Sequence, residues 1–382
     1  MTLFIFIFVT LYTVMHGLIF WGVSPLLHGH RRLLIAVCLW MALMIFAPLL
    51  IHLLDGNGNH QQARVMAFTG YGWMGFAFFT FSMFTLIASL EIARFLFSLA
   101  FHDLQRFSLH AAPVSISVLL IALIASLYGY FEAGSIRVEK IAITTEKPGH
   151  GREKLRIIQI SDLHLGLIHR EKTTGNITRL LDRIKPDMVV ATGDMVDAQI
   201  DHLNGVSNLW KMIDPPLGKF AVIGNHEIYA GLSQSIDFLR RSGFIVLRNE
   251  SAAVGNCIQL IGIDDEHVPG GTSDERGLLK DNASPLFTIF LKHRPTVPVP
   301  AGEGLFDLQL SGHAHRGQIF PFNLLTALHF PRQNGLYSLP EGGLLYASRG
   351  TGTWGPPMRF LSPPEITLFE ISFAKQSHGN SN

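Results

Sequence analysis

The sequence predicts an α/β domain that follows a helical membrane region. Residues 1–131 carry only eight acidic or basic side chains, whereas the rest of the chain has the charge content of an ordinary soluble domain. From residue 136 onwards, short apolar runs of strand type alternate with helical ones, a pattern typical of a sheet covered on both faces. Short clusters of acids and histidines follow several of these runs, so the second part is expected to carry the chemistry.

Four stretches of the N-terminal region are apolar and long enough to span a bilayer, which takes about 20 helical residues. They lie near residues 3–23, 33–54, 66–90 and 111–131. The first has neither a basic segment nor a small-residue cleavage site, so it is not expected to be a removable signal peptide. A buried bundle in a soluble protein is the alternative, but four consecutive near-uncharged segments favour a four-helix transmembrane region over residues 1–131.

Arginines between these segments predict the orientation of the chain. Arg31 and Arg32 follow the first span, and Arg94 and Arg106 follow the third, which places both loops in the cytoplasm under the positive-inside rule. Basic residues within 137–147 favour the opposite orientation, but charges that flank long translocated domains count for less. We therefore expect a multi-pass protein of the inner (cytoplasmic) membrane with its larger domain on the extracytoplasmic side.

The chain after the fourth span divides into a linker with a first strand (132–150), an α/β domain (151–375) and a disordered tail (376–382). Strands are predicted at 136–143, 155–160, 187–192, 220–223, 244–247, 258–263, 287–291, 305–310, 344–347 and 366–371, and a helix at 170–184. The late strands have little helix between them, so we expect them to form a second, more antiparallel sheet.

Five clusters of candidate ligands lie at the ends of strand-like runs. D-L-H begins at Asp162, G-D-M-V-D at Gly193, G-N-H-E at Gly224 and G-H-A-H at Gly312, and a lone K-H-R surrounds His293. Ligands of open α/β sheets gather at the carboxyl ends of the strands, so these clusters are expected to meet. Together they offer enough oxygen and nitrogen ligands for two metal ions, with one histidine left for acid–base work.

This set of ligands suits metal-assisted cleavage of a phosphoester. Two metals about 3.5–4 Å apart activate a water molecule and neutralise charge on the phosphoryl oxygens. Mixed imidazole, carboxylate and amide ligands fit Mn, Fe, Zn or Co better than Mg, and the absence of thiolates argues against a closed structural zinc site.

Charge and cysteine content exclude other functions. The net charge is +1, and no basic stretch interleaves with aromatic residues, so no nucleic-acid partner is expected. Cys38 and Cys257 lie in different halves of the chain, so no disulfide framework is implied. The sequence indicates no oligomeric state.

The order D-x-H, G-D-x-x-D, G-N-H-E, H, G-H-x-H resembles the calcineurin-like metallophosphoesterase superfamily over roughly residues 150–375. The resemblance implies a four-layer α/β/β/α sandwich, a metal-dependent phosphoric ester hydrolase and two divalent metal ions. The segment S-R-G-T-G-T-W-G-P-P-M-R (348–359) resembles the membrane-anchored bacterial branch of that superfamily.

The resemblance also implies a role for each motif residue. One metal would be held by Asp162, His164 and His315. The other would be held by Asn225, His293 and His313, with Asp194 as the bridge between the two. His226 matches the histidine that acts as an acid or stabilises an oxyanion.

Other charged residues near the motifs are expected to play supporting parts. Asp197, Glu227 and Arg316 are predicted to hold the site residues in place or to be structural, rather than to be catalytic. Arg349 and Arg359 are candidates to hold a substrate phosphate, because a guanidinium forks onto phosphate oxygens. An ordinary salt bridge is the alternative for both arginines.

Residues 319–340 follow the last motif and are strongly apolar, which leaves two interpretations open. They form either a cap of the core or an apolar wall beside the metals that suits an acyl or polyprenyl chain. Because four spans exceed what tethering requires, we expect a lipid-derived phosphoester or pyrophosphate as substrate. Hydrolysis of a nucleotide-linked lipid such as UDP-2,3-diacylglucosamine is the alternative. A membrane sensor or transporter with a phosphoesterase output module is a second alternative.

Overall fold

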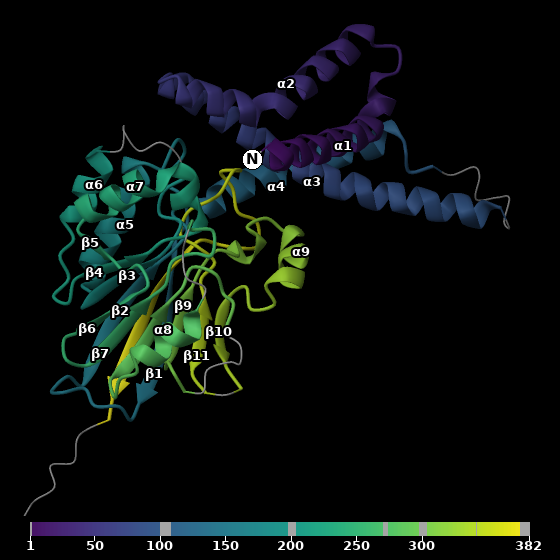
Figure 1. Cartoon of the computed structure of the whole chain (residues 1–382). Helices are drawn as coiled ribbons and strands as arrows, with labels where there is room; N and C mark the ends of the chain where they lie inside the picture. The colour runs from purple at the N-terminus through teal and green to yellow at the C-terminus, as the bar shows by residue number, and fades with distance from the viewer. Residues whose placement is uncertain are drawn as a thin grey trace, which may run out of the picture. The chain divides into compact units, whose positions relative to one another are not determined.

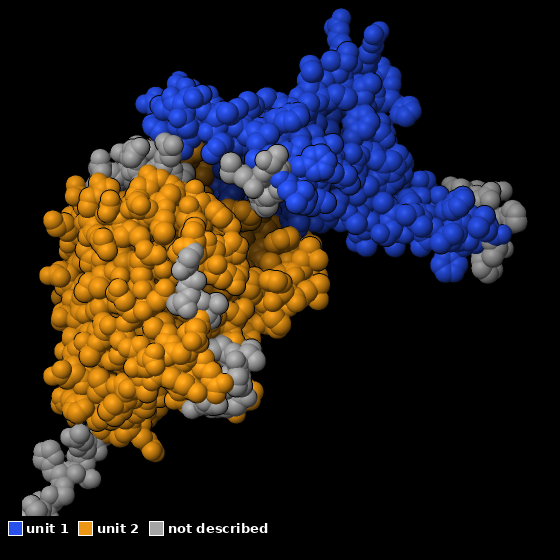
Figure 2. Space-filling model, in the orientation of Figure 1, with its two compact units in different colours: residues 1–132, 355–360 blue, residues 133–354, 361–382 orange. Residues whose placement is uncertain are grey.

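The computed structural model describes residues 2–99, 108–197, 204–269, 274–297, 304–340 and 342–374. The chain forms two compact units, coloured separately in Figure 2. Unit 1 comprises residues 1–132 with 355–360, and unit 2 comprises residues 133–354 with 361–382. The predicted disordered tail at 376–382 lies outside the described residues.

Unit 1 contains four long apolar helices: α1 (Thr2–Leu27), α2 (Arg31–Gly56), α3 (His60–Ser98) and α4 (Ala112–Ala133). Each is long and apolar enough to cross a membrane, as the sequence predicted. Helix α3 has 39 residues and rises about 58 Å at 1.5 Å per residue, roughly twice the thickness of the hydrocarbon core. The span predicted at 66–90 lies within this longer helix. Arg94 lies inside α3, not in a loop, and pairs with Glu91 at 2.8 Å.

The first sheet of unit 2 has the strand order β1-β12-β2-β3-β4-β5. Its strands are β1 (Arg137–Thr145), β12 (Glu365–Phe373), β2 (Lys154–Ile160), β3 (Met188–Thr192), β4 (Lys219–Val222) and β5 (Phe244–Val246). All neighbouring pairs are parallel except β12 with β2. The carboxyl ends of β2, β3 and β4 consequently meet at one edge of the sheet.

The second sheet has the strand order β10-β11-β9-β8-β7-β6. Its strands are β6 (Glu250–Val254), β7 (Ile258–Gly262), β8 (Phe287–Leu291), β9 (Leu308–Ser311), β10 (Gly335–Ser338) and β11 (Leu344–Ala347). The second sheet is more antiparallel than the first, as expected, with two antiparallel pairs against one, but most of its pairs are parallel. The central strands β11, β9, β8 and β7 are parallel, and antiparallel pairing occurs only with the edge strands β10 and β6.

The two sheets and their helices form the predicted four layers (Figure 1). Successive side chains of a strand point to opposite faces, so Ile157 packs between the two sheets while Ile158 packs under helices. Helices α5 (Glu171–Ile184), α6 (Asn204–Lys211) and α7 (Asn225–Arg241) cover the first sheet. The short helix α8 (Glu275–Asp281) packs on the second sheet through Leu279.

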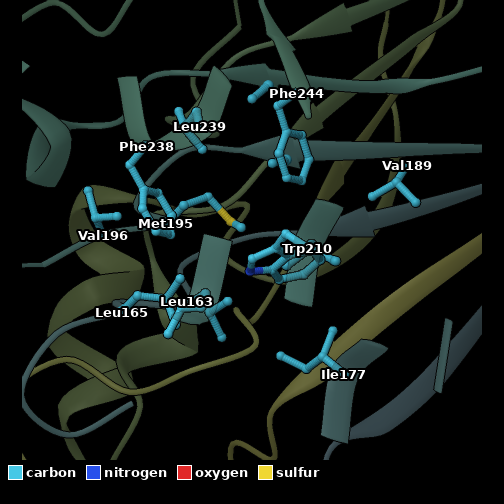
Figure 3. Packing of buried hydrophobic residues seen from close by; sticks show 14 of the residues in the cluster. Leu163, Leu165, Ile177, Val189, Met195, Val196, Trp210, Phe238, Leu239 and Phe244 are labelled. Atoms are coloured by element: carbon cyan, nitrogen blue, oxygen red, sulfur yellow. The ribbon is translucent and has the colours of Figure 1, made fainter. Parts of the chain in front are cut away.

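Two loops that carry candidate ligands are anchored in the core between the first sheet and its helices. Figure 3 shows Leu163, Leu165, Met195 and Val196 gathered with Trp210 and other buried apolar residues. All five of these side chains are fully buried. Leu163 and Leu165 alternate with Asp162 and His164 along the chain. Because the two leucines point into this core, Asp162 and His164 point to the other side of the loop.

Candidate metal centre

All five motif clusters follow strands of the two sheets. D-L-H follows β2, G-D-M-V-D follows β3, and G-N-H-E follows β4 and begins α7. K-H-R follows β8, and G-H-A-H follows β9 and leads into a short 3-10 helix, His315–Gly317. The three strands of the first sheet are parallel to one another, as are β8 and β9, so each sheet brings its motifs to one edge.

Asp162, His164 and His315 form one group that could hold a metal ion. The Nε2 atoms of the two histidines are 3.1 Å apart, and Nε2 of His315 lies 3.4 Å from Oδ1 of Asp162. Each of the three residues is buried. The structure thus brings together the set that the sequence predicted for the first metal.

Asp194, His293 and His313 form a second such group. Nε2 of His293 lies 3.1 Å from Oδ2 of Asp194 and 3.1 Å from Nδ1 of His313. The Nδ1 atom of His293 is 2.8 Å from the carbonyl oxygen of Thr192, which fixes the imidazole so that Nε2 faces the group. A hydrogen bond of this kind on the far nitrogen is typical of histidines that bind metals.

Asp194 belongs to more than one group, as expected for a bridging carboxylate. Its Oδ2 lies 3.1 Å from His293 on one side and 4.0 Å from Nε2 of His164 on the other. Asn225, the remaining predicted ligand, is buried, and its Oδ1 has no hydrogen-bond partner among the described residues. An orphaned buried oxygen is costly, and coordination to a cation would satisfy it. The donors present therefore fit a metal centre.

The backbone at the site is strained in a way that the fold imposes. Asp162, His164, Asp194, His313 and His315 all have positive φ angles, between 49° and 69°. This left-handed conformation is rare for residues with a side chain and clusters at functional sites. Hydrogen bonds hold it in place, since the amide of Asp162 donates to the carbonyl of Gly193 and that of His164 to the carbonyl of Asp194.

A close approach of two loops requires glycine at position 312. A Cβ atom there would overlap the carboxylate of Asp162 and the hydroxyl of Ser161. The next amide, that of His313, donates to both carboxylate oxygens of Asp162, at 2.9 and 3.1 Å. The G-H-A-H loop is thereby fixed directly on the D-L-H loop.

The buried carboxylate of Glu227 fixes the two remaining loops. It accepts hydrogen bonds from the amides of Asp194 (2.9 Å), Met195 (2.6 Å), Val196 (3.1 Å) and Gly224 (2.8 Å). These bonds join the loop after β3 to the first turn of α7. Glu227 thus has the structural role that the sequence predicted for it, and the four amides explain why an acid is needed there.

His226 is held by Asp197, one of the motif neighbours that the sequence predicted to support the site. Nδ1 of His226 lies 2.6 Å from Oδ1 of Asp197, and Nδ1 of His164 lies 3.4 Å from the same oxygen. The amide of His226 also donates to Oδ1 of Asp194 at 2.8 Å. His226 can join His164 and Asp194 as a third possible metal group, but with Nδ1 on Asp197 only its Nε2 remains to act on a ligand.

The charges of the site are strongly interdependent. Burial opposes ionisation of Asp194, but the imidazoles around it, His293 foremost, hold the pKa of its carboxyl well below the usual value. Burial likewise opposes the charge on His293, yet Asp194 raises its pKa to about 10. Burial and the neighbouring His293 lower the pKa of His313 to about 3. The buried carboxylates require positive charge beside them, and divalent cations would supply it while leaving the imidazoles neutral as ligands.

Of the two arginines suggested for substrate binding, Arg349 belongs to unit 2, which carries the metal centre, and Arg359 to unit 1. The guanidinium of Arg349 is bound by Glu139 at 2.5 Å and Glu365 at 2.6 Å, so it is taken up by an ion-pair network. Arg359 belongs to unit 1 and is fully buried, with its amide bonded to the carbonyl of Gly129. Arg349 is thus not free to bind a substrate phosphate, and the role suggested for Arg359 stays a prediction.

Another arginine, Arg294 of K-H-R, does reach the centre. Its NH1 lies 3.2 Å from Nε2 of His313, and its Nε donates to the buried Asp265 at 2.8 Å. Sequence reasoning singled out His293 in this motif and passed over its neighbour. The position of Arg294 directly after the predicted ligand His293 could have identified it.

Comparisons with known proteins agree with this geometry. A model of the calcineurin-like phosphoesterase family matches residues 155–317. An uncharacterized metallophosphoesterase of Aquifex aeolicus is 40% identical over 258 residues, which are 66% of this chain and 98% of that protein. A zebrafish (Danio rerio) transmembrane protein with a metallophosphoesterase domain is 31% identical over 66% of this chain and 61% of its own length.

One further relative has a named activity. The UDP-2,3-diacylglucosamine pyrophosphatase LpxG of Chlamydia trachomatis is 28% identical over 304 residues, covering 64% of this chain and 92% of that protein. The residues that the family model matches include all five motif clusters of the metal centre.

Proposed function

We propose that this chain, which belongs to the calcineurin-like metallophosphoesterase family, hydrolyses a phosphoester or pyrophosphate bond of a lipid-derived substrate. Family membership makes it a phosphoric ester hydrolase, and its four apolar helices make it a membrane protein. The lipid nature of the substrate is our proposal. It rests on one apolar helix beside the metal centre.

The residues of the centre divide the chemistry between them. Asp162, His164 and His315 would hold one metal, Asn225, His293 and His313 the other, and Asp194 would bridge the two. Metals held in this way supply an activated water and neutralise charge on the phosphoryl oxygens. His226, held by Asp197 through Nδ1, presents Nε2 to protonate the leaving oxygen or to stabilise its charge. Asp197 keeps the imidazole in the orientation and tautomer that this step needs.

Helix α9 (Phe322–His329) is the observation that supports a lipid substrate. None of its residues is buried, and Leu324, Leu325 and Leu328 are 60%, 60% and 82% exposed. Phe330, the residue after the helix, packs edge-on against the imidazole of His313 with ring centroids 5.1 Å apart. An exposed apolar helix whose end contacts a predicted metal ligand is suited to bind the hydrocarbon part of a substrate.

Replacing Leu324, Leu325 and Leu328 together with Gln should selectively weaken turnover of lipid phosphates. Because burying one CH₂ group contributes about 0.8 kcal/mol, loss of only three such contacts should lower kcat/KM by more than about tenfold. Turnover of a small water-soluble phosphodiester should change little. Both rates are measured on the full-length protein in detergent.

The matched control replaces Met212 and Ile245 with Gln, since both are exposed apolar residues of unit 2 outside α9. This variant should retain turnover of both substrates. If the α9 variant instead lost both activities equally and melted at a lower temperature, the helix would be a structural cap and the lipid proposal would be wrong.

A nucleotide-linked lipid is the second candidate substrate. The Chlamydia trachomatis relative is named as a pyrophosphatase of UDP-2,3-diacylglucosamine, a molecule that combines acyl chains with a nucleotide. Comparing this compound with simple lipid phosphates as substrates of the full-length protein would decide between the two candidates.

We also propose that unit 2 lies on the extracytoplasmic side of the inner membrane. Alkaline phosphatase fused after residue 140 should then be active, and green fluorescent protein fused at the same point should be dark. The proposal rests on Arg31 and Arg32, which follow the first helix in the sequence, and on Arg106, which follows the third. The reverse pattern of activity and fluorescence would place the metal centre in the cytoplasm and favour the nucleotide-linked substrate.

A further inference from the structure

We infer that Tyr229 and Trp354 form a binding subsite for a planar aromatic ring on the leaving-group side of the scissile phosphate. The inference rests on the proposed function in one respect, since it takes His226 as the group that faces the leaving oxygen. It goes beyond that function by naming two contact residues and the chemical class that they bind.

Both aromatic side chains flank the imidazole of His226 and remain open to a ligand. Tyr229, one turn along α7, has its ring centroid 5.5 Å from that of His226, and Trp354 has its centroid 5.9 Å away. The ring planes are tilted by 70° and 74°, so neither ring stacks face to face on the imidazole. Tyr229 is 64% exposed and Trp354 is 52% exposed.

The segment that ends in Trp354 is built onto the loops of the metal centre. The amide of Thr351 donates to the carbonyl of Ser161 at 2.7 Å, and that of Gly352 to the carbonyl of Asp162 at 2.9 Å. The amide of Thr353 lies 3.1 Å from Nε2 of His169. Glycine is required at position 352, because a Cβ there would overlap the carbonyl of Leu163.

Gln318 completes this support from the opposite side. Its side chain both donates to the carbonyl of Trp354 at 3.0 Å and accepts from the amide of Trp354 at 2.8 Å. Gln318 stands three residues after His315, so the G-H-A-H loop and Trp354 are fixed to each other. A large exposed aromatic residue whose backbone is bound this firmly is positioned for a ligand rather than for packing.

A planar ring is the ligand that this arrangement fits. Two exposed aromatic faces beside one imidazole offer stacking surface, which every planar heteroaromatic ring can use whatever its substituents. An acyl chain needs no aromatic wall, and the exposed leucines of α9, the helix that ends beside Phe330, already provide aliphatic surface. Tyr229 and Trp354 would thus bind the planar ring of a substrate, and the leucines of α9 its acyl chain.

The test compares two probes that share a phosphate and differ in the ring. Uridine 5′-monophosphate and ribose 5-phosphate are titrated by calorimetry into the full-length protein in detergent. We expect the nucleotide to bind roughly 5- to 150-fold more tightly, the range that stacking of one base contributes. The measured quantity is the dissociation constant of ribose 5-phosphate divided by that of uridine 5′-monophosphate. Trp354→Leu and Tyr229→Leu should each reduce this ratio towards 1, while Trp354→Phe should give an intermediate value.

Several variants separate the subsite from other roles of these residues. Gln318→Ala keeps both aromatic residues but should lower the ratio, because the backbone of Trp354 loses the two hydrogen bonds that hold it. Phe322→Leu removes an exposed aromatic residue of α9 and should leave the ratio unchanged. Tyr229 is exposed on a helix, so its replacement is not expected to unfold the protein.

A wild-type ratio near 1 would overturn the inference, as would a ratio that neither Trp354→Leu nor Tyr229→Leu changes. A loss of binding to phospholipid vesicles in Trp354→Leu without any change in the ratio would overturn it too, by making Trp354 a membrane anchor. Because the readout is binding, the subsite can be tested even if the phosphoesterase activity itself is not found.

Discussion

Asp194→Ala should abolish phosphoesterase activity and release at least one metal while leaving the fold intact. Asp194 is the carboxylate shared between the two predicted metal groups, with Oδ2 at 3.1 Å from His293 and 4.0 Å from His164. Without it, two cations would face each other with no negative charge between them. Activity should therefore fall by more than the roughly 10- to 100-fold that loss of a residue supporting a ligand costs.

Metal content by elemental analysis, turnover of a chromogenic phosphodiester and the melting temperature check this result. Asp182→Ala is the matched control, since it removes an exposed carboxylate from α5 and should change none of the three quantities. Two bound metals and near-normal turnover in Asp194→Ala would show that Asp194 is not the bridge.

His226→Gln should keep most of the bound metal and lower turnover by roughly 10²- to 10⁴-fold, the usual contribution of one general acid or base. The reason is that the two nitrogens of the imidazole have different roles. Nδ1 is held at 2.6 Å from Asp197, which leaves Nε2 for the substrate. Single-turnover rates and metal content, measured on the same preparations, separate an effect on the chemical step from loss of metal.

Asp197→Asn serves as the companion variant for this prediction. It leaves the imidazole in place but removes the charge that orients it, so its effect should be smaller, roughly 10- to 100-fold. If metal were lost from His226→Gln as completely as from Asp194→Ala, His226 would be a metal ligand and its catalytic role would be wrong.

The residues of the centre could be predicted from sequence because each motif ends a strand. Parallel strands bring their carboxyl ends to one edge, so Asp162 and Asp194 had to lie near each other once β2 and β3 were recognised. The types of the residues at these strand ends then identified the candidate metal ligands. Acids, histidines and an amide that follow buried strands suit few roles other than metal binding.

Other features depend on pairings that local patterns do not encode. Strand direction in the second sheet is one, because a buried apolar strand such as β9 looks the same whether its neighbours are parallel or antiparallel. The ion pairs of Arg349 are another, since Glu139 is 210 positions away along the chain. Pairing of an arginine with such distant carboxylates can be seen only in the fold.

The supporting residues of the site were the hardest to predict. Glu227 was expected to be structural, but its four backbone hydrogen bonds follow from where the chain turns after β3 and β4. Trp354 lies in a segment noted only for its resemblance to other sequences. Its place beside His226 depends on hydrogen bonds from Gln318, a residue 36 positions earlier.

The number of metal ions per chain tests the central claim most directly. Full-length protein is stripped with a chelator, reloaded stepwise with Mn²⁺ and followed by calorimetry, elemental analysis and hydrolysis of a chromogenic phosphodiester. We predict two ions bound per chain at saturation, with activity that appears as the second ion binds. Saturation with a single ion, or hydrolysis that persists in the metal-free protein, would contradict a dinuclear centre at this site.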